Sequence, residues 1–121
     1  MYRVIIADDE ESIRNRLKTM VEKFSDDFTV VGCFENGFDT LESGSQLEPD
    51  ILITDIRMPY MDGLELSKKA REEYPDLEII IFSGYGDFAF AQEAIRYGVT
   101  DYVLKPVDPD RFHDTIQKIQ K

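Results

Sequence analysis

The stretch that decides the fold is ILITDIRMPYMDG, residues 51–63. It opens with a short apolar run, residues 51–53, which lacks polar alternation and is therefore typical of a strand buried on both faces of a parallel sheet. Asp55 closes the strand, and residues 62–63 open an amphipathic helix that stops at Pro75. The apolar side of this helix is formed by Leu64, Leu66, Ala70 and Tyr74. A buried strand followed by an amphipathic helix is the repeating unit of an α/β fold.

This unit recurs along the chain. Three further apolar runs and one weaker run predict four more strands, at residues 4–7, 79–82, 102–104 and, for the weaker run, 28–34. The apolar residues of the helices between and after them are Ile13, Leu17, Met20, Val21 and Phe24 in the first, Phe88, Ala91, Ala94 and Ile95 in the fourth, and Phe112, Ile116 and Ile119 in the fifth. We therefore predict one α/β domain over residues 1–121, with a doubly wound five-stranded parallel sheet flanked by five helices.

The helix ends carry their own signals. We expect Asp87 and Asp108 to cap the fourth and fifth helices, and Gly98 to end the fourth. The second helix, roughly residues 38–47, is the weakest, because residues 43–45 read Ser-Gly-Ser where its last turns should form.

Composition excludes several classes of function. Fourteen Lys and Arg against 25 Asp and Glu give a net charge of −11, which repels nucleic acid and anionic lipid. One cysteine, Cys33, and one histidine, His113, allow neither an internal disulfide nor a cysteine-based zinc site. We expect Cys33 to be buried and His113 to lie on the surface. The short apolar runs and the charged N-terminal residues predict neither a membrane span nor a signal peptide, so a cytoplasmic location is expected.

Polar residues stand at the carboxyl ends of four predicted strands, where ligands bind in open parallel sheets. These residues are Asp8 and Asp9, Asp55, Ser83, and Lys105 with Pro106. Each has an ordinary explanation alone, since acids cap helices, Asp55 and Ser83 suit turns, and Lys105 suits a solvated surface. Their convergence on one edge of one sheet favours a functional site instead.

Three aspartates at one edge repel one another unless a cation joins them. Oxygen ligands from few protein groups suit Mg²⁺, and three aspartates, one Mg²⁺ and Lys105 together carry no net charge. Such a site is ready for an anionic phosphoryl donor. Asp55 stands centrally and is the best candidate for a carboxylate nucleophile, and Ser83 could then hydrogen-bond the new phosphoryl group.

Residues 6–10, 53–59 with 61–63, 82–84 and 102–106 together resemble the receiver domain of two-component response regulators. The resemblance implies a flavodoxin-like topology and a domain that promotes only its own phosphorylation and dephosphorylation, with no other enzymatic activity. It implies that Asp55 accepts phosphate from a sensor histidine kinase and that Lys105 pairs with the phosphoryl group. The implied Mg²⁺ ligands are Asp9, Asp55 and the backbone carbonyl of Arg57, with Asp8 acting through water. The implied switch pair is Ser83 and Tyr102, and the bond between Lys105 and Pro106 is implied to be cis.

A finer resemblance covers residues 83–88, 94–99 and 105–108, which are similar to receivers of AraC-type, YesN-like transcriptional regulators. It implies that the chain is the N-terminal part of a longer regulator. Phosphorylation would then change the face formed by the fourth helix, the fifth strand and the fifth helix, with homodimer formation possible. That face would control an attached DNA-binding domain, while this chain contacts neither nucleic acid nor membrane. The alternative within the family is a stand-alone receiver that signals by protein contact.

Two other classes were weighed against the same residues. A phosphohydrolase of the haloacid dehalogenase type needs a second acid two residues after the nucleophile, where this chain has Arg57, and usually a cap insertion for which there is no length. A flavin mononucleotide carrier needs a Ser, Thr or Gly loop after the first strand, but residues 8–11 are all acidic and would repel the phosphate.

Overall fold

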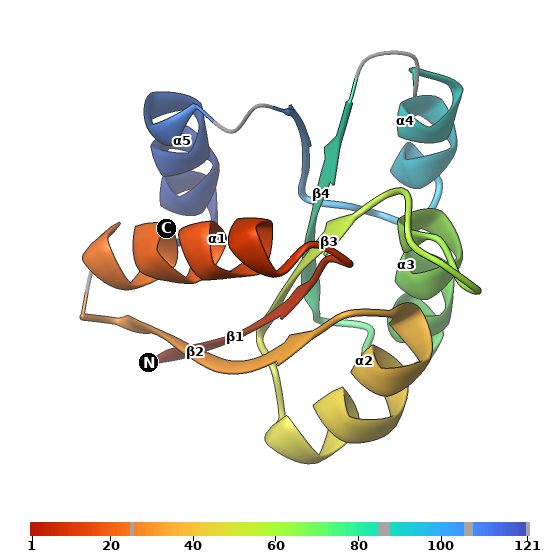
Figure 1. The fold of residues 1–121 in the computed structure, drawn as a ribbon, viewed down its shortest axis with the longest axis horizontal. Coiled ribbons are helices and arrows are strands. Elements are labelled where there is room, and N and C mark those ends of the chain that lie inside the picture. The colour runs from red at the N-terminus through yellow and green to blue at the C-terminus, as the bar shows by residue number, and fades with distance from the viewer. Residues whose placement is uncertain (25, 85–87, 106–107, 121) are drawn as a thin grey trace.

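Strands and helices alternate along the whole chain (Figure 1). The structure is a computed structural model that describes residues 1–24, 26–84, 88–105 and 108–120, with only the backbone described for Ser45, Phe88, Phe90, Ala91 and Gln120. The strands are β1 (Tyr2–Ala7), β2 (Phe28–Phe34), β3 (Ile51–Asp55), β4 (Glu78–Ser83) and β5 (Asp101–Leu104). The helices are α1 (Glu11–Phe24), α2 (Gly37–Gly44), α3 (Gly63–Glu73), α4 (Phe88–Ile95) and α5 (Pro109–Gln120), with a short 3₁₀ helix, η1 (Ser45–Leu47).

The five strands form one parallel sheet in the order β2-β1-β3-β4-β5. The chain moves from β1 outward to β2 and then returns past β1 to β3, so the direction of winding reverses between β1 and β3. Ligands bind beside such a reversal, beyond the carboxyl ends of the strands. The register places Ala7 beside Thr54, so Asp8 and Asp55 leave their strands side by side at this point.

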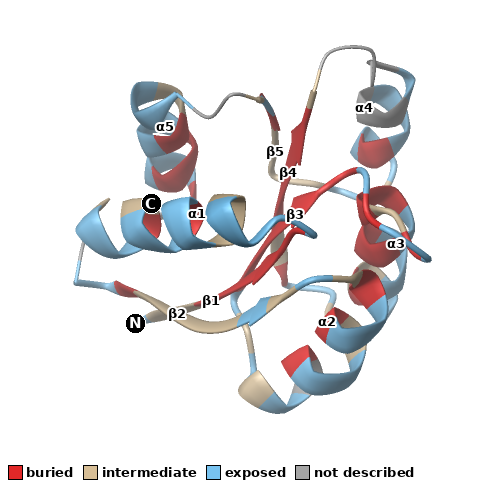
Figure 2. Cartoon of the chain, in the orientation of Figure 1, coloured by how far each residue is buried: buried red, intermediate tan, exposed pale blue. Residues whose placement is uncertain are grey.

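Helices cover both faces of the sheet (Figure 1). Successive side chains of β1 divide between two cores, with Ile6 in one and Ile5 in the other, as expected for a strand buried on both faces. Most of β1 is coloured as buried in Figure 2. The first core is completed from α1 and α5, by Leu17, Val21, Phe112, Ile116 and Ile119. The second is completed mainly from α3 and α4, by Leu64, Leu66, Ala70 and Ala94. The predicted fold class and the apolar stripe of α1 are both confirmed.

Three helix ends are confirmed in detail. Asp62 accepts a hydrogen bond from the Glu65 N–H and caps α3. Asp108 accepts one from the Asp110 N–H at the start of α5. After α4, Gly98 adopts a φ of +69°, a conformation that favours glycine. The predicted cap at Asp87 lies outside the described residues.

Three predictions need correction. The regular α2 helix ends at Gly44 and continues to Leu47 only as the η1 turn, consistent with the low helix propensity of residues 43–45. Cys33 is exposed, not buried, because it lies on β2, an edge strand with a single neighbour. Ile95 is also exposed, although its neighbour Ala94 is buried.

Among the described residues, no helix is long and apolar enough to span a membrane.

Candidate functional site

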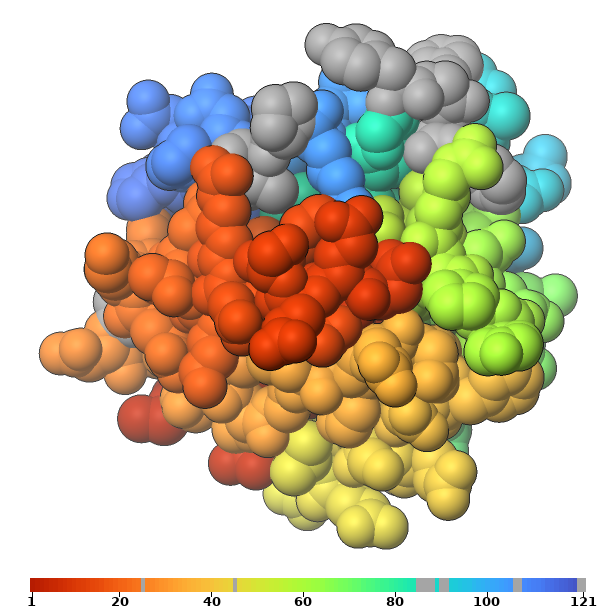
Figure 3. Space-filling model, viewed as in Figure 1, coloured from red at the N-terminus to blue at the C-terminus, as the bar shows by residue number. Residues whose placement is uncertain are grey.

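Three aspartate side chains meet at the carboxyl ends of β1 and β3, as predicted. One carboxylate oxygen from each of Asp8, Asp9 and Asp55 lies within 4.8 Å of the other two. Asp8 is fully buried and Asp55 is nearly so, whereas Asp9 is exposed. In Figure 3 the atoms at the start of α1 adjoin those of the loop between β3 and α3 on the visible face of the molecule. The acidic cluster therefore combines two buried carboxylates with one that faces solvent.

Lys105 brings a positive charge to this cluster from the end of β5. Its Nζ lies 3.1 Å from Oδ2 of Asp55 and 3.5 Å from Oδ2 of Asp8. Its backbone N–H donates to the Ser83 carbonyl at 2.7 Å, which continues the pairing of β4 with β5 and directs the side chain inward. The sequence prediction that these residues from separate strands would converge is confirmed.

Three hydrogen bonds hold Asp8, two through its backbone and one through its side chain. Its N–H donates to the Phe34 carbonyl at 3.0 Å, and its Oδ1 accepts from the Glu10 N–H at 2.9 Å. Its carbonyl accepts from Nη1 of Arg14 at 2.7 Å. Sequence reasoning missed Arg14, although a signal existed. A cation in the first turn of a helix opposes the helix dipole, so its presence there calls for a specific partner.

The loop after Asp55 folds back tightly onto the backbone of Asp55 itself. The Gly63 N–H donates to the Ile56 carbonyl at 2.8 Å, and a Cβ on Gly63 would lie 2.1 Å from the Asp55 carbonyl oxygen. At the tip of the loop, Tyr60 has a φ of +71°, and the Met61 N–H donates across it to the Pro59 carbonyl at 2.8 Å. Only glycine fits at position 63 without moving the strand end that carries Asp55.

Burial sets the electrostatics of the site. Burial raises the pKa of Asp8 to about 6, against the stabilising hydrogen bond from the Glu10 N–H and with a further increase from the Asp55 charge. Burial also raises the pKa of Asp55, although Lys105 opposes the increase. Burial lowers the pKa of Lys105, but Asp55 and Asp8 outweigh it and the net shift is upward. Lys105 alone therefore does not offset the cost of burying the Asp8 and Asp55 carboxylates.

The predicted switch residues are in contact. Ser83 is fully buried at the end of β4, and its hydroxyl donates to the hydroxyl of Tyr102 on β5. The Tyr102 ring is half-buried against the core formed with α3 and α4. The Arg57 side chain is exposed in the loop after β3. Pro106 lies outside the described residues, and so does the bond predicted to be cis.

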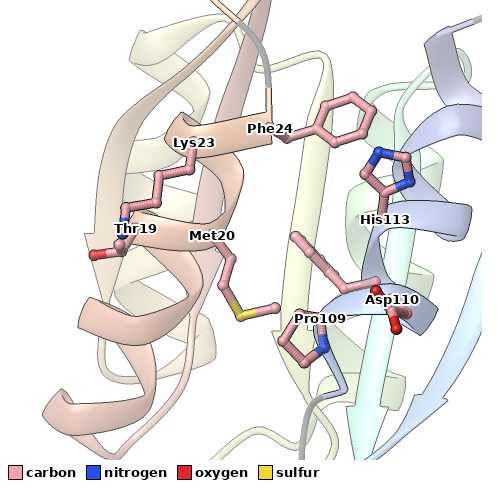
Figure 4. A pocket seen from close by; sticks show the side chains of 8 residues that line it. Thr19, Met20, Lys23, Phe24, Pro109, Asp110 and His113 are labelled. Carbon is pink, nitrogen blue, oxygen red and sulfur yellow. The ribbon is translucent and has the colours of Figure 1, made fainter.

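A separate hollow of about 390 Å³ lies between α1 and α5 (Figure 4). Its lining residues are Thr19, Met20, Lys23, Phe24, Pro109, Asp110, Phe112 and His113, none of which belongs to the acidic cluster. The ring of His113 meets that of Phe24 edge-on at 4.5 Å. His113 is exposed, as predicted.

Comparison with known proteins points to one family. Residues 4–117 match the response regulator receiver domain. The chain is 38% identical to the uncharacterized transcriptional regulatory protein YesN of Bacillus subtilis, over 98% of this chain and 32% of YesN. It is 35% identical to the chemotaxis protein CheY of Thermotoga maritima over 98% of both chains. The chain thus spans 32% of YesN and 42% of an uncharacterized response regulatory protein of Staphylococcus epidermidis, but nearly all of CheY.

Solved structures agree with this assignment. The receiver domain of AraT, a response regulator from Geobacillus stearothermophilus, superposes with a TM-score of 0.84 at 40% identity, covering 99% of this chain and 98% of that one. The isolated receiver domain of RcsB from Salmonella enterica serovar Typhimurium, solved with the phosphomimetic BeF3⁻, superposes with a TM-score of 0.89 at 28% identity, covering 98% and 88%.

Proposed function

Since the chain belongs to the response regulator receiver domain family, we propose that Asp55 accepts a phosphoryl group from a sensor histidine kinase in a Mg²⁺-dependent reaction. The observation that carries the proposal is the placement of Lys105 Nζ 3.1 Å from Asp55, beside two further carboxylates. A buried carboxylate next to a fixed cation, with a metal-type acidic cluster around it, is the arrangement that phosphoryl transfer to an aspartate requires.

The residues present fit a magnesium ion. Three carboxylates supply only oxygen ligands, which Mg²⁺ prefers, and among the described residues they outnumber the one cation, Lys105, that lies beside them. Asp9, Asp55 and the Arg57 carbonyl would hold the ion directly, and Asp8 would do so through water. When bound, it would neutralise oxygens of the incoming phosphoryl group.

In the transfer step, a carboxylate oxygen of Asp55 forms a bond to phosphorus as the bond between phosphorus and the kinase histidine nitrogen breaks. The electron pair of the broken bond stays on that nitrogen. The Lys105 ammonium stabilises the phosphoryl oxygens, and the Ser83 hydroxyl donates to one of them. The transfer step needs no molecule other than the phosphodonor, and only the later dephosphorylation of Asp55 would consume water.

The Ser83 hydroxyl carries one proton, and this couples the site to Tyr102. In the structure the Ser83 hydroxyl donates a hydrogen bond to the Tyr102 hydroxyl. Once Ser83 donates to the phosphoryl group instead, Tyr102 must become the donor or move. Tyr102 lies on β5, so its movement changes the face formed by α4, β5 and α5, where Ile95 and Leu104 are exposed. The phosphoryl group thereby shifts the populations of two states of this face.

We propose that this face controls an attached DNA-binding domain, with residues 1–121 as the N-terminal receiver of a longer cytoplasmic regulator that can pair as a homodimer when phosphorylated. The similarity to YesN, of which this chain spans 32%, supports that reading. The similarity to CheY over 98% of its length supports the alternative, a stand-alone receiver that signals by protein contact. The length of the native protein distinguishes the two.

Mass spectrometry tests the central proposal. Incubation with acetyl phosphate and Mg²⁺ should add one phosphoryl mass to the wild type, and Asp55→Asn should remove the gain, because the nucleophile is lost. Asp76→Asn is the control, since Asp76 is an exposed acid outside the cluster. If Asp55→Asn still gains the phosphoryl mass, Asp55 is not the acceptor.

A further inference from the structure

Arg14 stands beside the acidic cluster without belonging to it. It lies in the first turn of α1, is half-buried, and donates from Nη1 to the Asp8 carbonyl at 2.7 Å. Hydrogen bonds from a charged donor are stronger than those between neutral groups. The carbonyl oxygen that accepts this hydrogen bond belongs to the peptide that joins Asp8 to Asp9.

This peptide decides where the Asp9 carboxylate lies. Asp8 is fixed before it by its N–H bond to Phe34 and by its buried side chain, which accepts from the Glu10 N–H. The side chain of Asp9 is exposed, so core packing does not place it, yet its carboxylate lies within 4.8 Å of those of Asp8 and Asp55. The backbone on either side of Asp9 therefore places its carboxylate, and the Asp8 carbonyl held by Arg14 is part of that backbone.

We propose that Arg14 is a positioning residue of the cation site, which orients the peptide between Asp8 and Asp9 and thereby places the Asp9 carboxylate. The inference rests on the proposed function, because it assumes that Mg²⁺ binds to the acidic cluster. Groups that orient metal ligands change metal affinity by about 10- to 100-fold when removed, and we expect about tenfold here because Asp9 is one ligand among several.

The sign of the effect separates positioning from simple charge. Removing a positive charge near a cation site strengthens cation binding if only long-range electrostatics operate. Arg14→Gln should instead weaken Mg²⁺ binding about tenfold, because the peptide loses its anchor. Lys18→Gln is the matched control, since it removes the same charge from an exposed position on the same helix and should not weaken binding.

The experiment titrates Mg²⁺ alone into the full unphosphorylated chain and follows the backbone amide NMR signals of Asp9 and Glu10. The same variants are then phosphorylated with acetyl phosphate at limiting and saturating Mg²⁺. Arg14→Gln should be slow at limiting Mg²⁺ and approach the wild-type rate at saturation, since a general folding defect would lower both rates. Arg14→Lys, which keeps the charge and a donor, should bind Mg²⁺ with intermediate affinity.

Mg²⁺ affinity of Arg14→Gln equal to or tighter than that of the wild type would overturn the inference and leave the proposed function intact. Absence of Mg²⁺ binding or phosphorylation in the wild type would instead overturn the proposed function. Thermal unfolding of each variant checks that it is folded. Should Arg14→Gln not fold, the comparison of Arg14→Lys with Lys18→Gln decides by the same criterion.

Discussion

The pKa of Asp101 and the pKa values of Asp8 and Asp55 shift in opposite directions. Asp101 on β5 accepts from Nη1 of Arg111 at 2.7 Å, from the Thr115 hydroxyl at 2.6 Å and from the Tyr102 N–H at 2.8 Å. Burial would raise its pKa, but these donors, led by Arg111, hold the pKa well below its usual range. Asp8 and Asp55 share Lys105 at longer range, and their pKa values rise.

The difference separates a structural carboxylate from a functional one. Asp101 has its donors from α5 and its own strand, and so it joins α5 to β5. Asp8 and Asp55 are buried with too few donors, which costs folding free energy in the absence of a cation. A bound cation would therefore stabilise the acidic cluster, whereas Asp101 is stabilised by hydrogen-bond donors of the protein itself.

The largest expected effect tests the close approach of Gly63 to the Asp55 backbone, which positions the acidic cluster. Gly63→Ala should destabilise the protein by about 3 kcal/mol or more and abolish phosphorylation, because the new Cβ would lie 2.1 Å from the Asp55 carbonyl oxygen. Thermal unfolding and acetyl phosphate labelling measure both effects. Gly84→Ala is the control, since a Cβ there meets no atom of the described residues within 4 Å. Equal stability of the two variants would show that the close approach at Gly63 is not required.

The next largest effect tests the hydrogen bonds around Asp101. Asp101→Asn should destabilise the protein by about 2–3 kcal/mol, because Arg111 and Thr115 lose a charged acceptor. Urea unfolding at pH 7 measures the loss, with the exposed Asp76→Asn as a reference that should change stability little. A variant as stable as the wild type would remove the contrast between the two clusters.

The same change at Asp8 should have the opposite sign. Asp8→Asn should stabilise the Mg²⁺-free protein at pH 7 by about 2 kcal/mol, because the native carboxylate, with its pKa raised to about 6, no longer has to ionise in a buried site. Urea unfolding in the presence of a chelator measures it. Destabilisation by Asp8→Asn under these conditions would contradict the proposed origin of the raised pKa.

The effect of Asp8→Asn should also depend on pH. The folded wild type binds more protons at Asp8 than the unfolded chain between about pH 4 and pH 6, so the Asp8 contribution to stability falls as pH rises through this window. The advantage of Asp8→Asn should therefore be absent below about pH 4 and complete above about pH 6. An advantage that does not change across this range would assign the effect to packing and not to charge.

Much of this site follows from the sequence, because parallel strands carry their last residues to one edge. Apolar runs located β1, β3, β4 and β5, and from their ends Asp8, Asp9, Asp55 and Lys105 were expected together. Asp101 was missed, since its partners depend on how α5 docks onto the sheet. Arg14 was missed although its position in the first turn of α1 was a signal in the sequence. Burial of Cys33 was predicted wrongly because a strand's place at the sheet edge is a property of topology, which a local run of residues does not encode.

The loop that follows Asp55 stores conformational energy at Tyr60. A non-glycine residue with a φ of +71° costs about 1–2 kcal/mol, and here the cost falls on a side chain that is 87% exposed and gains little from packing. Glycine would adopt this turn without strain but would leave the unfolded loop with more conformational entropy. The relieved strain is larger than this entropic cost, so an engineer seeking a more thermostable domain would begin with Tyr60→Gly or Tyr60→Asn.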